Sequence, residues 1–184
     1  MVRPNIVYLH SHDTGRYVQP YGYAVRTPNI QRLAEQGILF RQAHSAAPTC
    51  SPSRAALLTG MYPHSAGQYG LVNRGFELPN PAHHIVNLLG TTGYHTALAG
   101  LQHVRSDPST IGYHQILETD GRKARDVAPV AASFITERSS NEPFFLTVGF
   151  SETHRPFPVP APVDDARYLR PPVPMLDTPE TRGD

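Results

Sequence analysis

The sequence reads PTCSPSRAALLTG at residues 48–60, and the third residue of this stretch, Cys50, is the only cysteine of the chain. The alanine- and leucine-rich run after it predicts a short helix, which Gly60 can end because glycine adopts the left-handed conformation found at helix C-termini. Cys50 is therefore expected at a helix N-terminus, where backbone N–H groups and the helix dipole favour anions. The residues alone leave two interpretations open, a reactive thiol and a buried structural cysteine.

Alternating strands and helices extend from this stretch in both directions. Apolar, β-branched-rich runs predict strands at residues 5–9, 94–99 and 144–150, with a further candidate at 38–43. Helices are expected over residues 27–37, 50–60, 84–89 and 126–135, whereas 61–81 and 106–120 are expected to be mostly irregular. In the first helix Ile30, Leu33 and Ala34 form a core-facing stripe, and Asp126 is expected to cap the last. The alternation predicts an α/β fold with a largely parallel sheet flanked by helices.

Three of the predicted strands are followed at once by a polar loop that contains histidine. These loops hold His12 and Asp13, His103, and His154. Ligands of open α/β sheets bind outside the carboxyl ends of the strands, so the pattern predicts one site at that edge. Histidines in loops are also often merely exposed, and the pattern alone does not exclude this.

The stretch around Cys50 resembles the C-x-P-S-R…LLTG motif of the type I sulfatases, a family of the alkaline phosphatase superfamily. PNIV at residues 4–7, TPN at 27–29 and GILF at 37–40 also match this family. The likeness covers nearly the whole chain, but only the N-terminal part of the family's domain. Between Cys50 and Leu71 it is greatest for the heparan N-sulfatase (sulfamidase) branch. The resemblance implies the alkaline phosphatase-like sulfatase fold, truncated before its C-terminal part.

The resemblance also implies a mechanism. Cys50 is expected to be converted to formylglycine by a formylglycine-generating enzyme, which reads the C-x-P-x-R core. In the family one hydroxyl of the hydrated aldehyde attacks sulfur, and the other later releases sulfate by re-forming the aldehyde. Arg54 is expected to hold the nucleophile and its charge, His103 to hydrogen-bond residue 50, and His154 to be the general acid or a sulfate donor.

A divalent metal is a further implication of the resemblance, and calcium is the metal that the family suggests first. Asp13 matches the second of two adjacent metal-binding aspartates, residue 50 is another expected ligand, and His12 replaces the first aspartate. Calcium prefers oxygen ligands, whereas imidazole suits manganese or zinc. Either His12 is a ligand and the metal changes, or His12 only lines the site.

The loop that carries His103 departs from the family's G-K-x-H pattern. The lysine of that pattern, a sulfate contact in many sulfatases, is Leu101 in this sequence. Gln102 and Arg105 are the nearby polar side chains that would compensate. The family's second metal motif, an aspartate followed by asparagine or histidine, would come after Asp184.

Composition excludes several classes of protein. With 16 Lys and Arg against 15 Asp and Glu, the net charge is +1, and no basic patch supports nucleic-acid binding. A single cysteine excludes an internal disulfide framework, and no apolar run approaches the roughly 18 residues that span a bilayer. The first strand begins by Asn5, which leaves no room for a signal peptide. We therefore expect a cytoplasmic protein, or a periplasmic or secreted one if the true start lies upstream.

The domain and function predictions follow from these points. Residues 1–155 are expected to be the N-terminal part of a sulfatase catalytic domain. Residues 156–184, which hold eight prolines, are expected to be an extended segment that leads to the remainder of that domain. The predicted function is hydrolysis of a sulfate ester or N-sulfate, on a sulfated small molecule or glycan. The alternatives are a phosphodiester or phosphonate monoester hydrolase of the same superfamily and a non-catalytic truncated relative.

Overall fold

A computed structural model describes residues 3–139, 141–157, 167, 170–173 and 175–183 of the chain. The chain divides into two units, Met1–His154 and Arg155–Asp184. The second unit contains a short helix, α6 (Pro179–Gly183), so the prediction that the proline-rich tail holds no regular structure is wrong there. A helix tolerates proline at its first position, because the missing N–H has no intrahelical partner to bond. Residues 158–166 of the predicted extended segment lie outside the described residues.

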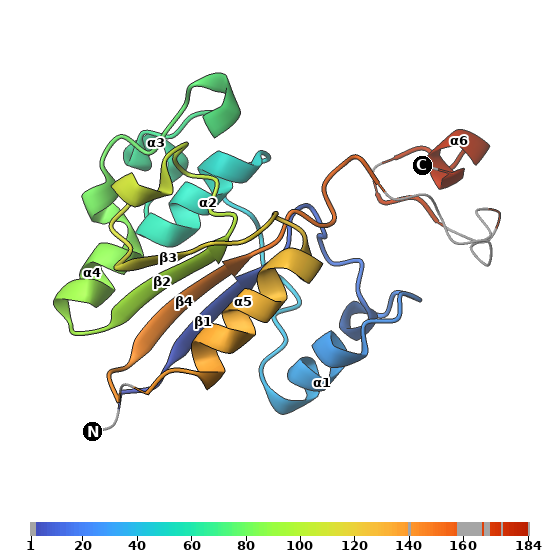
Figure 1. Cartoon of the computed structure of the whole chain (residues 1–184). Coiled ribbons are helices and arrows are strands. Elements are labelled where there is room, and N and C mark those ends of the chain that lie inside the picture. The colour runs from blue at the N-terminus through green and yellow to red at the C-terminus, as the bar shows by residue number, and fades with distance from the viewer. Residues whose placement is uncertain (1–2, 140, 158–166, 168–169, 174, 184) are drawn as a thin grey trace. The chain divides into compact units, whose positions relative to one another are not determined.

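A four-stranded parallel sheet forms the centre of the first unit. Its strands are β1 (Ile6–His10), β2 (His95–Gly100), β3 (Gln115–Leu117) and β4 (Phe144–Gly149), in the spatial order β1-β4-β2-β3 (Figure 1). The predicted α/β class with a parallel sheet is confirmed. β4 is buried along its whole length because it lies between two strands and beneath helices on both faces, which explains its unbroken apolar sequence.

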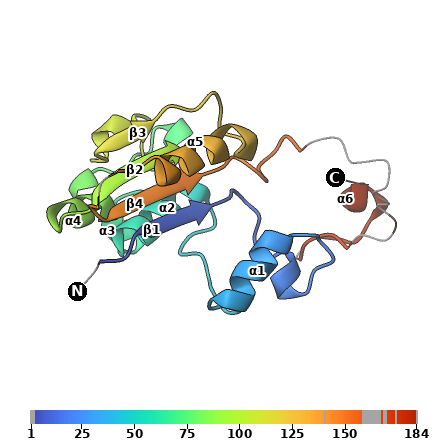
Figure 2. The same ribbon diagram turned by 60° about the horizontal axis from the view of Figure 1, so that its bottom comes forward.

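Helices cover both faces of the sheet (Figures 1 and 2). On one face, Val127 and Ala131 of α5 pack against alternate residues of β2 and β4, among them Leu146 and Val148. On the other face, residues from α2, α3 and α4 form a second core with Phe145 of β4. The helices of this unit are α1 (Pro28–Gln36), α2 (Cys50–Thr59), α3 (Pro63–Ala66), α4 (Ile85–Thr91) and α5 (Ala124–Thr136), with short 3₁₀ helices at Gln19–Tyr21, Val72–Arg74, Pro81–His83 and Pro108–Thr110.

The predicted strand at residues 38–43 and the core-facing stripe of the helix before it are both wrong. Residues 38–43 form no strand, and α1 buries none of its residues. Leu33 is 62% exposed and Ile38 is 81% exposed. An amphipathic pattern indicates a face that suits burial, but only a neighbouring element can bury it.

Two further predictions need correction. The stretch 106–120, expected to be irregular, contains strand β3, which is three residues long and therefore leaves little periodic signal. Asp126 is not the N-cap of α5, because the helix begins at Ala124, after Lys123. Asp126 instead accepts a hydrogen bond from the backbone N–H of Lys123 at 3.3 Å, which still stabilises the first turn.

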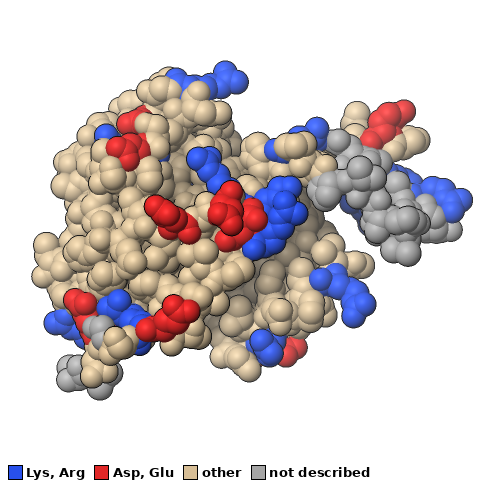
Figure 3. Space-filling view, viewed as in Figure 1, with Lys and Arg blue, Asp and Glu red and all other residues tan. Residues whose placement is uncertain are grey.

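The surface of the described residues agrees with the balanced composition. On the face seen in Figure 3, acidic and basic side chains are interspersed rather than gathered into a large area of one sign. No helix among the described residues is both long enough and apolar enough to cross a membrane.

Candidate active site

The carboxyl ends of three strands lie level with one another. Gly149 of β4 pairs with His10 of β1 on one side and with Gly100 of β2 on the other. A Cβ atom on Gly149 would lie 2.0 Å from the carbonyl oxygen of Leu101 and 2.5 Å from the His10 ring. Only glycine at position 149 lets the loops after these strands approach one another so closely. The three histidine-containing loops were predicted to meet at this edge of the sheet.

Cys50 is the first residue of α2, and Thr49 is the N-cap. At the other end of the helix, Gly60 has a φ of 68° and donates its backbone N–H to the carbonyl of Ala56. Both ends of this helix are therefore where the sequence predicts them. The Cys50 side chain is half-buried, and α2 directs it toward the loops that follow β1 and β2.

Arg54 lies one turn after Cys50 and is almost fully buried. Its Nη1 lies 2.6 Å from Nδ1 of His10, and its Nη2 donates to the Ser11 carbonyl at 3.4 Å. Burial and then the Arg54 charge lower the pKa of His10 to about 3. His10 is therefore a neutral hydrogen-bond acceptor that fixes the guanidinium. The sequence reasoning missed His10, although its position at the end of the first strand was visible.

His12 is held between the loops that follow β1 and β4. Its N–H donates to the Glu152 carbonyl at 2.7 Å, and its own carbonyl accepts from the Thr153 N–H at 2.6 Å. Only 4% of its side chain is exposed, and Nδ1 lies 2.9 Å from a carboxylate oxygen of Asp13 without good hydrogen-bond geometry. Burial lowers the pKa of His12, and the Asp13 carboxylate partly opposes this shift.

Asp13 and His103 both adopt the left-handed conformation, with φ of 59° and 66°. In non-glycine residues this conformation costs about 1–2 kcal/mol and is enriched at functional sites. His103 lies beside His12, with 5.6 Å between the ring centroids, and its Nδ1 is buried without a hydrogen-bond partner. Burial, followed by the charges of His12 and Arg54, lowers the pKa of His103 to about 4.

His154 completes the cluster from the loop after β4. Its Nε2 lies 3.9 Å from the second carboxylate oxygen of Asp13, and its ring meets the His12 ring edge-on at 4.7 Å. The side chain is 51% exposed, so it is open to an approaching substrate. The structure thus brings all six predicted site residues together: Cys50, Arg54, His103, His154, Asp13 and His12.

Among the residues that the structure describes, potential metal ligands fall into two groups that share His12. Ligand atoms of His12, Cys50 and His103 all lie within 4.8 Å of one another, and so do those of His12, Asp13 and His154. These groups suit a divalent metal in general. They offer one carboxylate, whereas calcium takes six to eight oxygen ligands, so this donor set does not fit calcium. Calcium therefore stays a prediction from the family alone.

Gln102 and Arg105 do not supply the charge that the family lysine would bring. The Gln102 amide oxygen accepts from the Val104 N–H at 2.6 Å, and its nitrogen donates to the Arg105 carbonyl. Arg105 donates to the Leu78 carbonyl at 2.7 Å and pairs with Glu77. Both side chains therefore brace the loop after β2.

Arg122, which precedes α5, is a cation that the sequence reasoning did not consider. Its charge contributes to lowering the pKa of His103. Its carbonyl accepts from the Ser151 N–H at 2.7 Å, so its backbone is fixed to the loop after β4. Arg122 therefore brings a positive charge near the site from an element that carries none of the predicted site residues.

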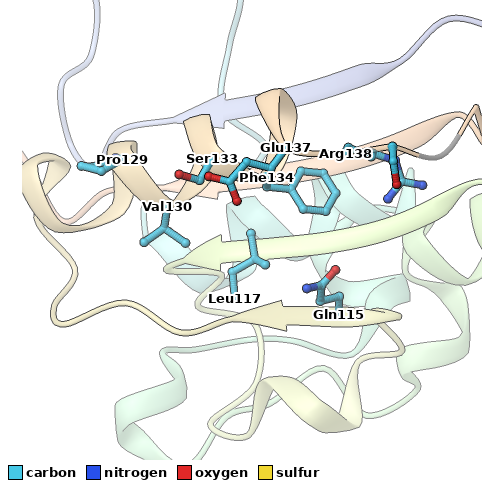
Figure 4. A pocket seen from close by; sticks show the side chains of 9 residues that line it. Gln115, Leu117, Pro129, Val130, Ser133, Phe134, Glu137 and Arg138 are labelled. Carbon is cyan, nitrogen blue, oxygen red and sulfur yellow. The ribbon is translucent and has the colours of Figure 1, made fainter.

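A separate open groove of about 610 Å³ lies between α5 and β3 (Figure 4). Leu117, Val130 and Phe134 line it, with Glu137 and Arg138 at the C-terminal end of α5. The N-terminal end of α5 faces the histidine cluster, since the Ala124 N–H donates to the Glu152 carboxylate. The groove runs along α5 from Pro129 onward, and its lining includes none of the predicted site residues.

The comparison with protein families identifies the family of this chain. A sulfatase family model matches residues 4–172. The chain belongs to the sulfatase family. The resemblance predicted from the Cys50 motif is confirmed, whereas the roles of the individual site residues stay predictions.

Named sulfatases are similar to this chain in sequence. Human N-sulphoglucosamine sulphohydrolase is 32% identical over 142 residues, which are 72% of this chain and 28% of that protein. The N-acetylglucosamine-6-O-sulfatase of Bacteroides thetaiotaomicron is 28% identical over 183 residues, 87% of this chain and 32% of that protein. The chain thus spans about a third or less of the length of these sulfatases.

Solved structures agree with the sulfatase fold. The structure of BT4656 in complex with its substrate D-glucosamine-2-N,6-O-disulfate matches with a TM-score of 0.72 and 25% identity, covering 83% of this chain and 35% of that one. An alkaline phosphatase superfamily protein from Vibrio parahaemolyticus matches with a TM-score of 0.56 and 22% identity, covering 86% and 42%. The predicted superfamily fold is confirmed.

Proposed function

We propose that this sulfatase-family protein hydrolyses a sulfate ester or N-sulfate on a sugar, with formylglycine derived from Cys50 and a divalent metal. The observation that carries the proposal is the convergence of the Cys50 helix N-terminus with histidines from three strand-end loops. Such an edge is where α/β folds bind ligands, and the C-x-P-S-R motif lies there in the register that maturation requires.

Arg54 and His10 together place a fixed, buried positive charge in the site. Formylglycine at position 50 supplies an oxygen nucleophile that cysteine lacks, and a bound divalent metal polarises the sulfate oxygens. Arg54 balances negative charge beside residue 50, where its guanidinium is desolvated and therefore effective. His10 accepts from that guanidinium and keeps it oriented.

His103 and His154 are the two histidines proposed to act on the attacking and the leaving group. A ring nitrogen of His103 lies within 4.8 Å of the Cys50 sulfur, and a hydrogen bond from this ring would orient the attacking oxygen. His154 is half-exposed and suits the leaving-group side. It donates a proton to the leaving oxygen or nitrogen as the bond to sulfur breaks, which removes the charge that would otherwise develop there.

The substrate class comes from the relatives. One is named for N-sulphoglucosamine, another for N-acetylglucosamine-6-O-sulfate, and a solved neighbour holds a disulfated glucosamine. We therefore propose a sulfated amino sugar as the substrate, and a formylglycine-generating enzyme as the maturation partner.

The decisive experiment uses the protein purified from its native source. Peptide mapping across residues 48–60 should find an aldehyde oxygen in place of the Cys50 sulfur. The same preparation should turn over aryl sulfate and N-sulfated glucosamine. Substitutions Cys50→Ala and His154→Ala should abolish or strongly reduce turnover, whereas His44→Ala, at an exposed histidine outside the cluster, should not.

Three outcomes would count against this proposal. Faster cleavage of an aryl phosphonate than of the matching sulfate would favour the phosphonate or phosphodiester hydrolase. Folded, metal-loaded protein with no turnover of any ester would favour the non-catalytic relative. An unmodified Cys50 in the native protein would remove the proposed nucleophile.

A further inference from the structure

Before Cys50 is modified, the site contains a set of metal ligands that differs from the one proposed for catalysis. The Cys50 sulfur, one nitrogen of His12 and one nitrogen of His103 lie within 4.8 Å of one another. They come from three separate elements: the N-terminus of α2, the loop after β1 and the loop after β2. With a small approach of these side chains, a sulfur and two imidazole nitrogens would contact a single ion at the usual Zn–S and Zn–N distances of roughly 2.0–2.3 Å.

One ring nitrogen of these histidines is buried without a hydrogen-bond partner, and another has only a carboxylate beside it. The first is Nδ1 of His103, and the second is Nδ1 of His12, which lies 2.9 Å from an Asp13 oxygen without good hydrogen-bond geometry. A buried polar atom without a partner costs about 1–3 kcal/mol. Such an atom on the His103 ring, beside a free thiol and the His12 imidazole, indicates a ligand that these three side chains share.

The backbone holds these donors in place without a ligand. Hydrogen bonds to Glu152 and Thr153 clamp His12 on both sides. His103 is kept in its left-handed conformation by a loop that Gln102 braces through the Val104 N–H. Because the donors are already positioned, a metal need not order them when it binds.

Charge balance favours the same ion. The Arg54 charge would attract a thiolate at Cys50, so a metal-bound thiolate would have a buried counter-charge one helical turn away. Asp13 contacts the His12 ring, with a carboxylate oxygen 2.9 Å from Nδ1. A divalent cation held by one thiolate and two neutral imidazoles would therefore have both an arginine and a carboxylate nearby.

We propose that the unmodified chain binds Zn²⁺, or a similar borderline divalent metal, through Cys50, His12 and His103. On binding, the thiol releases its proton to solvent and a metal–sulfur bond forms, with a fourth position left for water. Sulfur and imidazole donors select this class of metal, whereas Ca²⁺ takes oxygen donors. The proposal concerns the form before maturation and does not depend on the sulfatase reaction.

Cobalt(II) is the probe that tests this proposal, because it replaces zinc and absorbs light. The unmodified protein, made in cells that lack the maturation enzyme and stripped of metal, is titrated with Co²⁺ without oxygen. We expect one Co²⁺ per chain, a near-ultraviolet thiolate-to-cobalt band and intense visible bands of a four-coordinate site. Zn²⁺ should displace the cobalt at one equivalent, and a large excess of Ca²⁺ should not.

Matched variants identify the ligands. Cys50→Ser should remove the thiolate band, and His103→Ala should weaken binding by at least about 100-fold, because one of three protein ligands is lost. His154→Ala, within the same cluster but outside the proposed ligand set, should keep the band. His12→Asp should lower Co²⁺ affinity and raise Ca²⁺ affinity.

The proposal is overturned if no thiolate band forms, if the band survives Cys50→Ser, or if Ca²⁺ displaces the metal. Loss of the band in His154→Ala but not in His103→Ala would assign a different ligand set and overturn it as well. Circular dichroism of each variant establishes that the fold is retained. None of these readouts uses turnover, so they remain informative if the proposed function fails.

Discussion

Nη1 of Arg54 lies 2.6 Å from Nδ1 of His10, and both side chains are largely buried. The arginine follows Cys50 in α2, and the histidine ends β1, so the contact joins the motif helix to the sheet. A neutral imidazole is a suitable partner for a buried guanidinium, because it accepts a hydrogen bond without cancelling the charge that the site needs.

Replacing His10 should impair the site through Arg54. In His10→Leu, Nη1 of the buried Arg54 loses its acceptor, at a cost of about 1–3 kcal/mol. We expect kcat for sulfate ester hydrolysis to fall roughly 10- to 100-fold with a smaller change in KM. His10→Asn keeps an acceptor near the Nδ1 position and should stay within about threefold of the wild type. Equal losses in both variants would show that His10 acts only by packing.

Gly149 should tolerate no side chain. In Gly149→Ala the new Cβ would lie 2.0 Å from the Leu101 carbonyl, and the strand ends would have to separate. We expect destabilisation of at least about 3 kcal/mol in denaturant unfolding, since the obstructing atom is backbone. The control Gly60→Ala has open space around its Cβ and should cost about 1 kcal/mol through its left-handed φ alone. Similar losses for both would contradict the steric argument.

Arg122 should influence His103 through its charge. Its positive charge is one of the causes that lower the pKa of His103, after burial and the charges of His12 and Arg54. In Arg122→Gln the pKa of His103 should rise, and added salt should reduce the difference because Arg122 is exposed. NMR titration of the imidazole measures the shift. Arg125→Gln, which removes a nearby cation paired with Asp126, should leave His103 unchanged.

Acid should destabilise the fold through His84. This buried residue is the N-cap of α4 and accepts from the Val86 N–H through Nδ1 at 3.3 Å. Burial lowers the pKa of His84 to about 4, whereas an unfolded histidine titrates near about 6.5. Between these values the unfolded chain binds more protons, so the free energy of unfolding falls on acidification, by at most about 1.4 kcal/mol per pH unit.

The variant His84→Asn tests this origin of the pH dependence. Asparagine can still cap the helix, but it does not titrate. The slope of unfolding free energy against pH between about 4 and 6.5 should therefore be shallower than in the wild type. The exposed neighbour His83 provides the control, and His83→Asn should leave the slope unchanged. An unaltered slope in His84→Asn would assign the acid sensitivity to other groups.

Local sequence signals determined the main features of the fold. The apolar runs of β1, β2 and β4 are long enough to identify parallel strands, and Cys50 to Gly60 contains both ends of its helix. The expectation that the first strand is buried is wrong, because Val7 and Leu9 of β1 are exposed. The three histidine loops were predictable as one site, because parallel strands place their carboxyl ends at the same edge. The family motif then predicted Cys50 as the reactive residue at that edge.

Only the tertiary structure decided which apolar faces are buried and which polar groups meet. The stripe of α1 was visible in the sequence, yet Leu33 remains exposed, because burial depends on a neighbour that the pattern does not specify. Arg54 and His10 are 44 residues apart, and no spacing rule connects them. The sequence determined the conformations set by interactions within one helix or strand, whereas contacts between distant residues depended on how the sheet and its helices pack together.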